Sequence, residues 1–237
     1  MRRGTILAAA LPMLLIAGPA LAAPSEGLTL SSDVTRTALV LTVLAILPAI
    51  LISMTSFVRI VITLSMVRHA FGMPETPPNP VLISLALFLT AFSMAPTFQT
   101  LNAQAVQPFL SGQLTVPEAM AKGSVPLRDF MLAQTRDADI ATIYALAKAP
   151  LPTRPDQVDI LKLAPAFIMN ELRVSFTIGF VILLPFLLID LVVSAILLGL
   201  GMMMVPPATI SLPIKLLMFV LIDGWSLVIQ GVLGSFR

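Results

Sequence analysis

The sequence has no cysteine, and only one histidine, one tryptophan and one tyrosine among its 237 residues. Without thiols there can be no disulfides, cysteine nucleophiles or Cys/His zinc sites. A histidine-dependent hydrolase would have to use His69. The motifs of P-loop nucleotidases, zinc metalloproteases and nucleophile-elbow hydrolases are also missing. We therefore expect no enzymatic activity, no cofactor and no resident metal.

Charged residues are scarce as well. They make up 11% of the chain, whereas about 25% is usual for soluble domains. The net charge of +2 is too small for wrapping a polyanion, so nucleic-acid binding is not expected. In contrast, 57% of the residues are hydrophobic, more than a globule of this size can bury. The composition predicts a membrane protein.

The N-terminus has the pattern of a secretory signal peptide. Two arginines precede an apolar run over residues 6–17, and small residues lead up to Ala22 and Ala23, between which we expect cleavage. The run is shorter than the roughly 20 residues that cross a bilayer, which disfavours the alternative of a retained transmembrane helix. Residues 1–22 would then be removed. Residues 23–37 would form a periplasmic lead.

Four further apolar stretches fall into two pairs. They occupy Ala38–Val58, Val81–Phe98, Val174–Leu200 and Ile214–Phe236. This pattern predicts an all-α fold with one pair of membrane-associated helices over 38–98 and a second hairpin over 174–237. Charges of both signs return in residues 99–173, for which we expect a small region of short helices.

The first apolar helix is expected to run on to Phe71 and to end at Gly72. A helix over residues 38–71 would be about 50 Å long, more than the hydrocarbon core of about 30 Å, so part of it should project or lie within an assembly. Arg59 and Arg68 would lie on the cytoplasmic side, which places residues 99–173 in the periplasm. Within that region, helices should start near Thr115, Ser124 and Asp137.

The most unusual segment of the sequence is methionine-rich and interrupts the second pair of apolar stretches. Its members are Gly199, Gly201, Met202, Met203, Met204, Pro206 and Pro207. The two prolines forbid a continuous helix and the glycines allow unusual dihedral angles. Methionine is flexible and polarisable, so the three side chains could form an adaptable seal in a conduit. A hairpin turn buried in lipid is the alternative.

Two carboxylates, Asp190 and Asp223, are expected deep inside apolar spans, where a bare charge costs several kcal/mol. Lys215 is the one base inside these two apolar stretches and could neutralise Asp190 from the same or a neighbouring chain. Proton relay, as in a transporter, is the alternative role for the two acids.

Five strings resemble the FliP family of flagellar biosynthetic proteins. They read MTSFVRIVITLSMVRHAFG, PPNPVLISLALFLT, LRDFMLAQTRDADIA, PAFIMNELRVSFTIGFVILLPFLLIDLV and LGMMMVPPATISLPIKLLMFVLIDGW. The resemblance runs from about Met54 to the C-terminus. Pro80 departs from the polar residue that is often found there. The signal peptide and the long polar region are more similar to the flagellar branch than to the injectisome counterparts.

The resemblance implies a subunit of the type III export gate in the bacterial inner membrane and flagellar basal body. It implies a homo-oligomer, a pentamer, that forms a closed helical pore with FliQ and FliR, joins FlhB and FlhA, and passes unfolded flagellar proteins. It further implies that Met202, Met203 and Met204 form a gasket, and that Asp190 and Lys215 pair between neighbouring subunits. A proton-coupled transporter using Asp190 and Asp223 remains the rival function.

Overall fold

The computed structural model describes Thr37, Leu41, Thr42, Ala45, Pro48 and residues 52–72 and 75–236. The chain divides into two compact units, residues 1–45 and 46–237. In the first unit the four described residues are helical and exposed. The expected signal peptide, its cleavage between Ala22 and Ala23, and nearly all of the polar lead lie outside the described residues.

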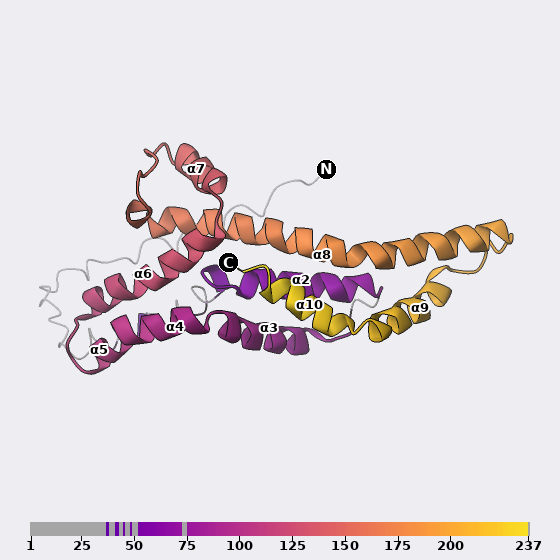
Figure 1. Ribbon diagram of the computed structural model, residues 1–237, viewed down its shortest axis with the longest axis horizontal. Coiled ribbons are helices and arrows are strands. Elements are labelled where there is room, and N and C mark those ends of the chain that lie inside the picture. Colours follow the sequence, from indigo (N-terminus) through magenta and orange to yellow (C-terminus); the bar gives the residue numbers. More distant parts are fainter. Residues whose placement is uncertain are drawn as a thin grey trace, which may run out of the picture. The chain divides into compact units, whose positions relative to one another are not determined.

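Within residues 46–237 the described part of the chain is helical and contains no strand, which confirms the all-α prediction (Figure 1). The α-helices are α2 (Phe57–Ala70), α3 (Asn79–Ser93), α4 (Ala95–Leu101), α5 (Gln107–Leu110), α6 (Val116–Gln134), α7 (Asp137–Leu146), α8 (Ile160–Gly199), α9 (Ala208–Leu221) and α10 (Gly224–Leu233). A π-helix, η1 (Asn102–Val106), and a 3₁₀ turn, η2 (Pro155–Gln157), complete the unit.

Helix α8 is the spine of this unit. Its 40 residues run without interruption across the boundary expected between 173 and 174. Helices α2, α6 and α7 pack against it, and α9 returns beside its far end. Of the described helices, α8 alone is long and apolar enough to cross a membrane, and the bent pairs α3–α5 and α9–α10 qualify only if each counts as one span.

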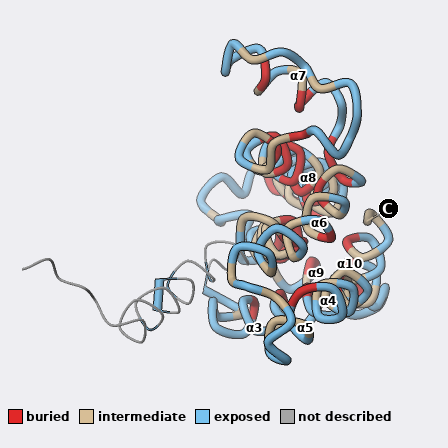
Figure 2. The backbone as a smooth tube through the Cα atoms, turned by 90° about the vertical axis from the view of Figure 1, so that its left-hand side faces the viewer, coloured by how far each residue is buried: buried red, intermediate tan, exposed pale blue. Residues whose placement is uncertain are grey.

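Two apolar cores form along α8, and Figure 2, which views this helix end-on, shows buried residues gathered on it. The first core joins α2, α3, α8, α9 and α10, and includes an edge-to-face cluster of Phe71 with Phe186 and Phe219. The second core joins α6, α7 and the start of α8 around Met131 and Phe167, both fully buried. Side chains of the two cores therefore hold α8 at two separate places.

The prediction of one helix from residue 38 to Phe71 is wrong, because the chain leaves the helical conformation at residues 54–56 and α2 starts afresh at Phe57. Thr55 and Ser56 are buried at this break. Their hydroxyls offer local alternatives to helical hydrogen bonds: Thr55 Oγ1 accepts from the Phe57 N–H at 3.4 Å, and Ser56 Oγ lies 2.6 Å from Ser93 Oγ.

Two more of the expected helices are also broken. The helix expected over Val81–Phe98 ends at Ser93 and bends by 64° into α4, because the ring of Pro96 is incompatible with a continuing helix. The helix expected over Ile214–Phe236 starts earlier, at Ala208, and bends by 67° after Leu221.

The polar region follows its predicted helix starts in part. The Thr115 and Glu118 side chains form a capping box at the start of α6, and α7 starts at Asp137, as predicted. The start predicted near Ser124 is wrong, because α6 continues through Pro126 to Gln134. Gly72 has a φ of +76°, so the predicted stop after α2 has the left-handed geometry that glycine tolerates best.

Candidate functional site

The methionine segment forms the turn between α8 and α9. The N–H of Met202 donates to the carbonyl of Leu197 at 2.9 Å, and that of Gly201 donates to Leu198 at 3.1 Å, which together make a Schellman motif. Gly201 occupies its left-handed position with a φ of +73°. Gly199 is the last residue of α8, and Pro207 caps α9. The main chain of this turn is thus fixed by its own hydrogen bonds.

The methionine side chains at this turn are left uncovered. The exposed fraction rises from 44% at Met202 to 81% at Met203 and 96% at Met204. Three large apolar side chains at the tip of a long helix gain nothing from water. Their exposure therefore points to a surface that is covered by something other than the described part of this chain.

Asp190 on α8 and Lys215 on α9 form an ion pair within the chain. Lys215 Nζ donates to Asp190 Oδ2 at 2.5 Å. The lysine side chain is 7% exposed and the aspartate 41% exposed, so the lysine depends on its partner more than the aspartate does. The same-chain pairing that the sequence left open is the one found here. A pairing between neighbouring subunits stays a prediction.

Asp223 is not inside a continuous span. It lies in the turn between α9 and α10, exposed, with a φ of +51°. The next residue must be small, because a Cβ on Gly224 would lie 2.1 Å from the ring of Phe219. The expectation that Asp223 lies inside a continuous helix is therefore wrong, while its depth in a membrane and its part in a proton relay stay predictions.

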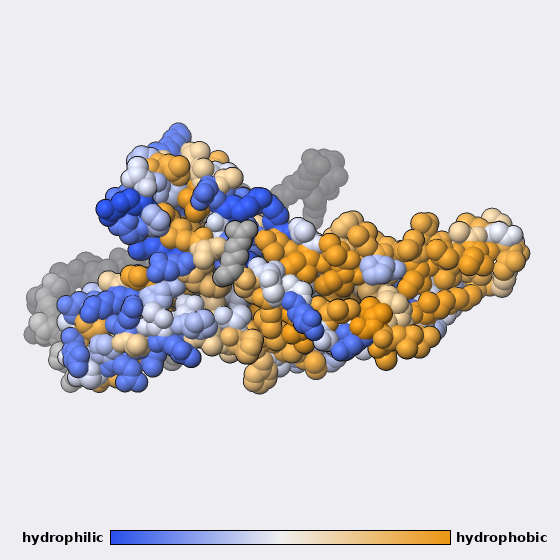
Figure 3. All heavy atoms as spheres, in the orientation of Figure 1, coloured by the Kyte–Doolittle hydropathy of each residue, from blue (hydrophilic) through white to orange (hydrophobic). Residues whose placement is uncertain are grey.

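An apolar surface surrounds the methionine turn. Figure 3 shows hydrophobic residues gathered over the far part of α8 and over α9, and hydrophilic residues gathered towards α6 and α7. The exposed side chains on α8 include Leu184, Leu187, Leu188, Leu191, Val192, Ile196 and Leu198. Single exposed leucines are ordinary, but a contiguous patch of this kind marks contact with lipid or with other proteins.

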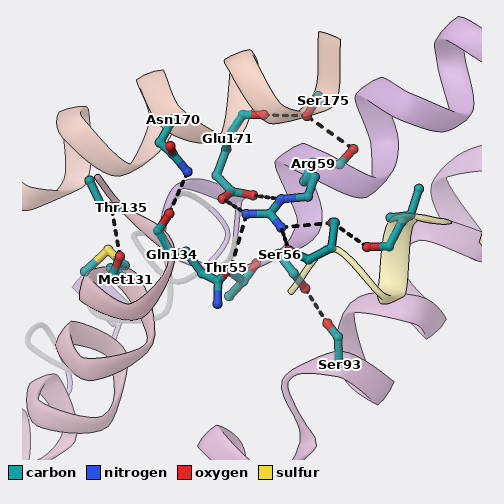
Figure 4. Close-up of polar contacts among 12 residues, drawn as sticks. Thr55, Ser56, Arg59, Ser93, Met131, Gln134, Thr135, Asn170, Glu171 and Ser175 are labelled. Atoms are coloured by element: carbon teal, nitrogen blue, oxygen red, sulfur yellow. Dashed lines mark hydrogen bonds and ion pairs between the residues drawn. The ribbon is translucent and has the colours of Figure 1, made fainter. Parts of the chain in front are cut away.

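A second polar site, which the sequence did not reveal, lies around Arg59 (Figure 4). Arg59 is 1% exposed, so the protein itself encloses this charge, and its placement on the cytoplasmic side stays a prediction. Its Nε donates to Glu171 Oε2 at 2.9 Å, and its Nη2 pairs with the other oxygen of that fully buried carboxylate. This fork is the bidentate geometry in which arginine binds carboxylates most strongly.

Side chains around the ion pair extend the network to α6. The side-chain oxygen of Gln134 accepts a hydrogen bond from Arg59 Nη2 at 3.3 Å. Its backbone carbonyl accepts one from Asn170 Nδ2 at 2.7 Å. Ser175 Oγ donates to the Glu171 carbonyl at 2.6 Å and lies 3.4 Å from the Arg59 carbonyl. The signal that could have found this site is a lone arginine in an apolar stretch, which needs a buried partner.

Comparison with known proteins assigns these features to a family. A family model described as the FliP family matches residues 40–232. Three proteins named flagellar biosynthetic protein FliP are close relatives. That of Pectobacterium carotovorum subsp. carotovorum is 49% identical over 201 residues, covering 85% of this chain and 78% of its own. That of Caulobacter vibrioides is 47% identical over 211 residues, covering 89% of this chain and 79% of its own. That of Bacillus subtilis is 46% identical over 205 residues, covering 86% of this chain and 93% of its own.

Proposed function

The chain belongs to the FliP family, and we propose that it is a pore-forming core subunit of the flagellar type III protein export gate. In this role it passes unfolded flagellar proteins across the bacterial inner membrane and carries out no catalysis. The observation that carries the proposal is the methionine turn, in which three apolar side chains stand exposed at the tip of a long helix with uncovered leucines. The flagellar names of the relatives favour this role over the injectisome counterpart.

The length of α8 supports an assembly. At about 1.5 Å per residue, its 40 residues extend about 60 Å, twice the hydrocarbon thickness of about 30 Å. The chain itself covers the first part of this helix, but residues 176–199 extend about 36 Å with most of their leucines exposed, which is still longer than the hydrocarbon core. Copies of the chain packed side by side would cover the exposed leucines, and a closed ring would bring the methionine turns together on its axis.

The gasket follows from the chemistry of methionine. A ring of thioether side chains excludes water and ions because an apolar constriction dewets. It can also deform around a passing chain, because each side chain has several free torsions. The ring is proposed to be a pentamer that associates with FliQ, FliR, FlhB and FlhA, with residues 99–173 in the periplasm.

Ion leakage and secretion together test the gasket. Replacing Met202, Met203 and Met204 by alanine should leave the complex with FliQ and FliR at its normal mass but raise its resting ion conductance in planar bilayers. Deleting the segment should leak more and impair secretion of flagellar proteins. A triple variant that assembles and stays as ion-tight as the parent would contradict the gasket.

Mixed subunits test whether the Asp190–Lys215 pair crosses between subunits. Asp190→Lys and Lys215→Asp each place like charges together within one chain. If neighbouring subunits exchange partners, co-expression of the two variants restores part of the assembly, because each supplies the charge the other lacks. A pair that stays within one chain predicts rescue only when both changes are in the same chain.

A further inference from the structure

The last residues of the chain end against the buried guanidinium of Arg59. Its Nη1 donates to the carbonyl of Ser235 at 2.9 Å and lies 3.0 Å from the hydroxyl of the same residue. The ring of Phe236 covers one face of the guanidinium, with its centroid 4.0 Å from Cζ. Both residues follow the end of α10 at Leu233. Residues that follow the last turn of a helix often fray, but Ser235 and Phe236 are held by a buried charge.

The hydrogen bonds of Arg59 leave no donor unused. A guanidinium has five N–H groups: one on Nε and two on each terminal nitrogen. Nε and Nη2 are directed to Glu171 and Gln134, and Nη1 is directed to Ser235. A foreign anion would find the charge already neutralised and the donors occupied, so the site is not a ligand pocket. It is complete only when the chain's own C-terminal residues are in place.

We propose that Arg59 is a latch for the C-terminus. The residues Ser235 and Phe236 bind the guanidinium and fix the position of α10 against α2, so that the C-terminal helix is held by its far end as well as by its own apolar face. Arg59 acts as a positioning residue in this device, and Glu171 holds the guanidinium in the orientation that faces the C-terminus.

The packing of α10 agrees with a latch at its end. The helix is only ten residues long, and its buried side consists of Gly224, Val228 and Val232. A helix this short is marginal without tertiary contacts. Its start is attached through the close contact of Gly224 with Phe219. The latch supplies the matching attachment at the other end.

Thiol labelling can test the latch because the chain has no cysteine of its own. We would place a single cysteine at Val232, which is 1% exposed next to the latch, or at Leu163, which is 0% exposed in the second core. In each background the Ser235→Gly/Phe236→Ala double variant removes the hydroxyl contact and the ring over the guanidinium, keeps the backbone carbonyl at position 235, and leaves the Arg59–Glu171 pair intact. Labelling rates are measured on the purified full-length protein in detergent.

The latch predicts a local effect. The double variant should raise the labelling rate at position 232 about tenfold or more, because α10 opens more often, and change the rate at position 163 by less than about twofold. Arg59→Lys should act in the same direction at position 232, because lysine lacks the planar fork. Ser235→Thr should keep the parent rate, because it retains the hydroxyl that Arg59 contacts.

Gln230→Ala is the matched control on the same helix. Gln230 is exposed and donates only to Ser226, so its loss should leave both labelling rates unchanged. Three results would overturn the latch: an unchanged rate at position 232 in the double variant, an equal rise at both positions, which indicates general loosening, or an equally large effect of Gln230→Ala.

Discussion

The two halves of α8 differ in how the rest of the chain covers them. In the proximal half, residues 160–175, buried positions recur every three or four residues: Leu163, Ala166, Phe167, Asn170, Glu171 and Ser175. In the distal half, residues 176–199, the buried positions are Gly179, Phe186, Val193 and Leu197, and the first three are seven residues apart. The proximal half is thus wrapped by a wide stripe of contacts, and the distal half touches the chain along a narrow one.

This difference separates what the chain completes alone from what it leaves open. Around the proximal half, α2, α6 and α7 supply an apolar core and a saturated ion pair. Around the distal half, the first core packs on Phe186 and α9 supplies one ion pair, but most of the leucines and the methionines stay exposed. We infer that the proximal half determines the fold of the subunit, and that the distal half is the surface on which the proposed pore is assembled.

The buried ion pair should give the largest effect on the proximal half. Glu171→Leu leaves Arg59 buried without its carboxylate and should lower the free energy of unfolding by about 3–5 kcal/mol. The Arg59→Met/Glu171→Leu double variant should recover a large part of that loss, because no charge is stranded. Thermal unfolding in detergent measures both. A double variant less stable than Glu171→Leu would show that the pair contributes more than the relief of one buried charge.

A matched pair of methionines compares the halves directly. Met131 is fully buried against the proximal half, so Met131→Ala should cost about 2–5 kcal/mol of unfolding free energy. Met203 is 81% exposed, so Met203→Ala should change the stability of the isolated chain by less than about 0.5 kcal/mol. Circular dichroism melts of the two variants provide the measurement. Equal losses would abolish the distinction between the halves.

In the ion pair of the distal half, replacing Asp190 should lower the stability more than replacing Lys215. Asp190→Ala strands Lys215, which is nearly buried, and should cost on the order of 1–3 kcal/mol. Lys215→Met should cost less, because Asp190 is 41% exposed and keeps access to water. Proton flux in reconstituted vesicles distinguishes an export gate from a proton-coupled transporter. If the protein is a transporter, Asp190→Asn abolishes the flux while the complex still assembles.

The smallest expected effect is the pH dependence of stability that comes from Glu118. This residue lies at the start of α6, one of the helices that pack on the proximal half. The Thr115 backbone N–H and hydroxyl donate to Glu118 at 2.8 and 2.7 Å and lower the pKa of this carboxyl below 4.5. A lowered pKa stabilises the fold above the unfolded-state pKa, and this contribution is lost as the pH falls through the folded-state pKa. The difference in melting temperature between the parent and Glu118→Gln should therefore be constant near neutral pH and shrink below about pH 4.5.

The sequence predicted the class of the fold well because composition and helix signals are local. The apolar stretches, the Thr115–Glu118 capping box and the stop at Gly72 could all be identified from neighbouring residues. The breaks were harder to predict. Pro96 and the Asp223–Gly224 pair are local turn signals, but they lie inside apolar runs, where hydropathy alone predicts a continuous helix. The break at residues 54–56 carries no such signal, since it depends on contacts of Ser56 with a distant helix.

The candidate sites divide in the same way. The methionine turn could be placed from sequence because glycines and prolines bracket it. The Arg59 site could not, because its partners lie on α6, on α8 and at the C-terminus, far away in the sequence. Periodicity identifies which residues share a helix face but not which distant carboxylate meets a buried arginine.

Disulfide trapping at Met203 tests the central claim, that the methionine turns of several copies meet on the axis of a pore. Because the chain has no native cysteine, Met203→Cys introduces a single thiol, and Leu161→Cys gives a control of similar exposure, 78% against 81%, on the proximal half. Mild oxidation of the intact complex should convert Met203→Cys, but not Leu161→Cys, into covalent dimers of this chain. Complexes of normal mass in which Met203→Cys stays monomeric would contradict the account.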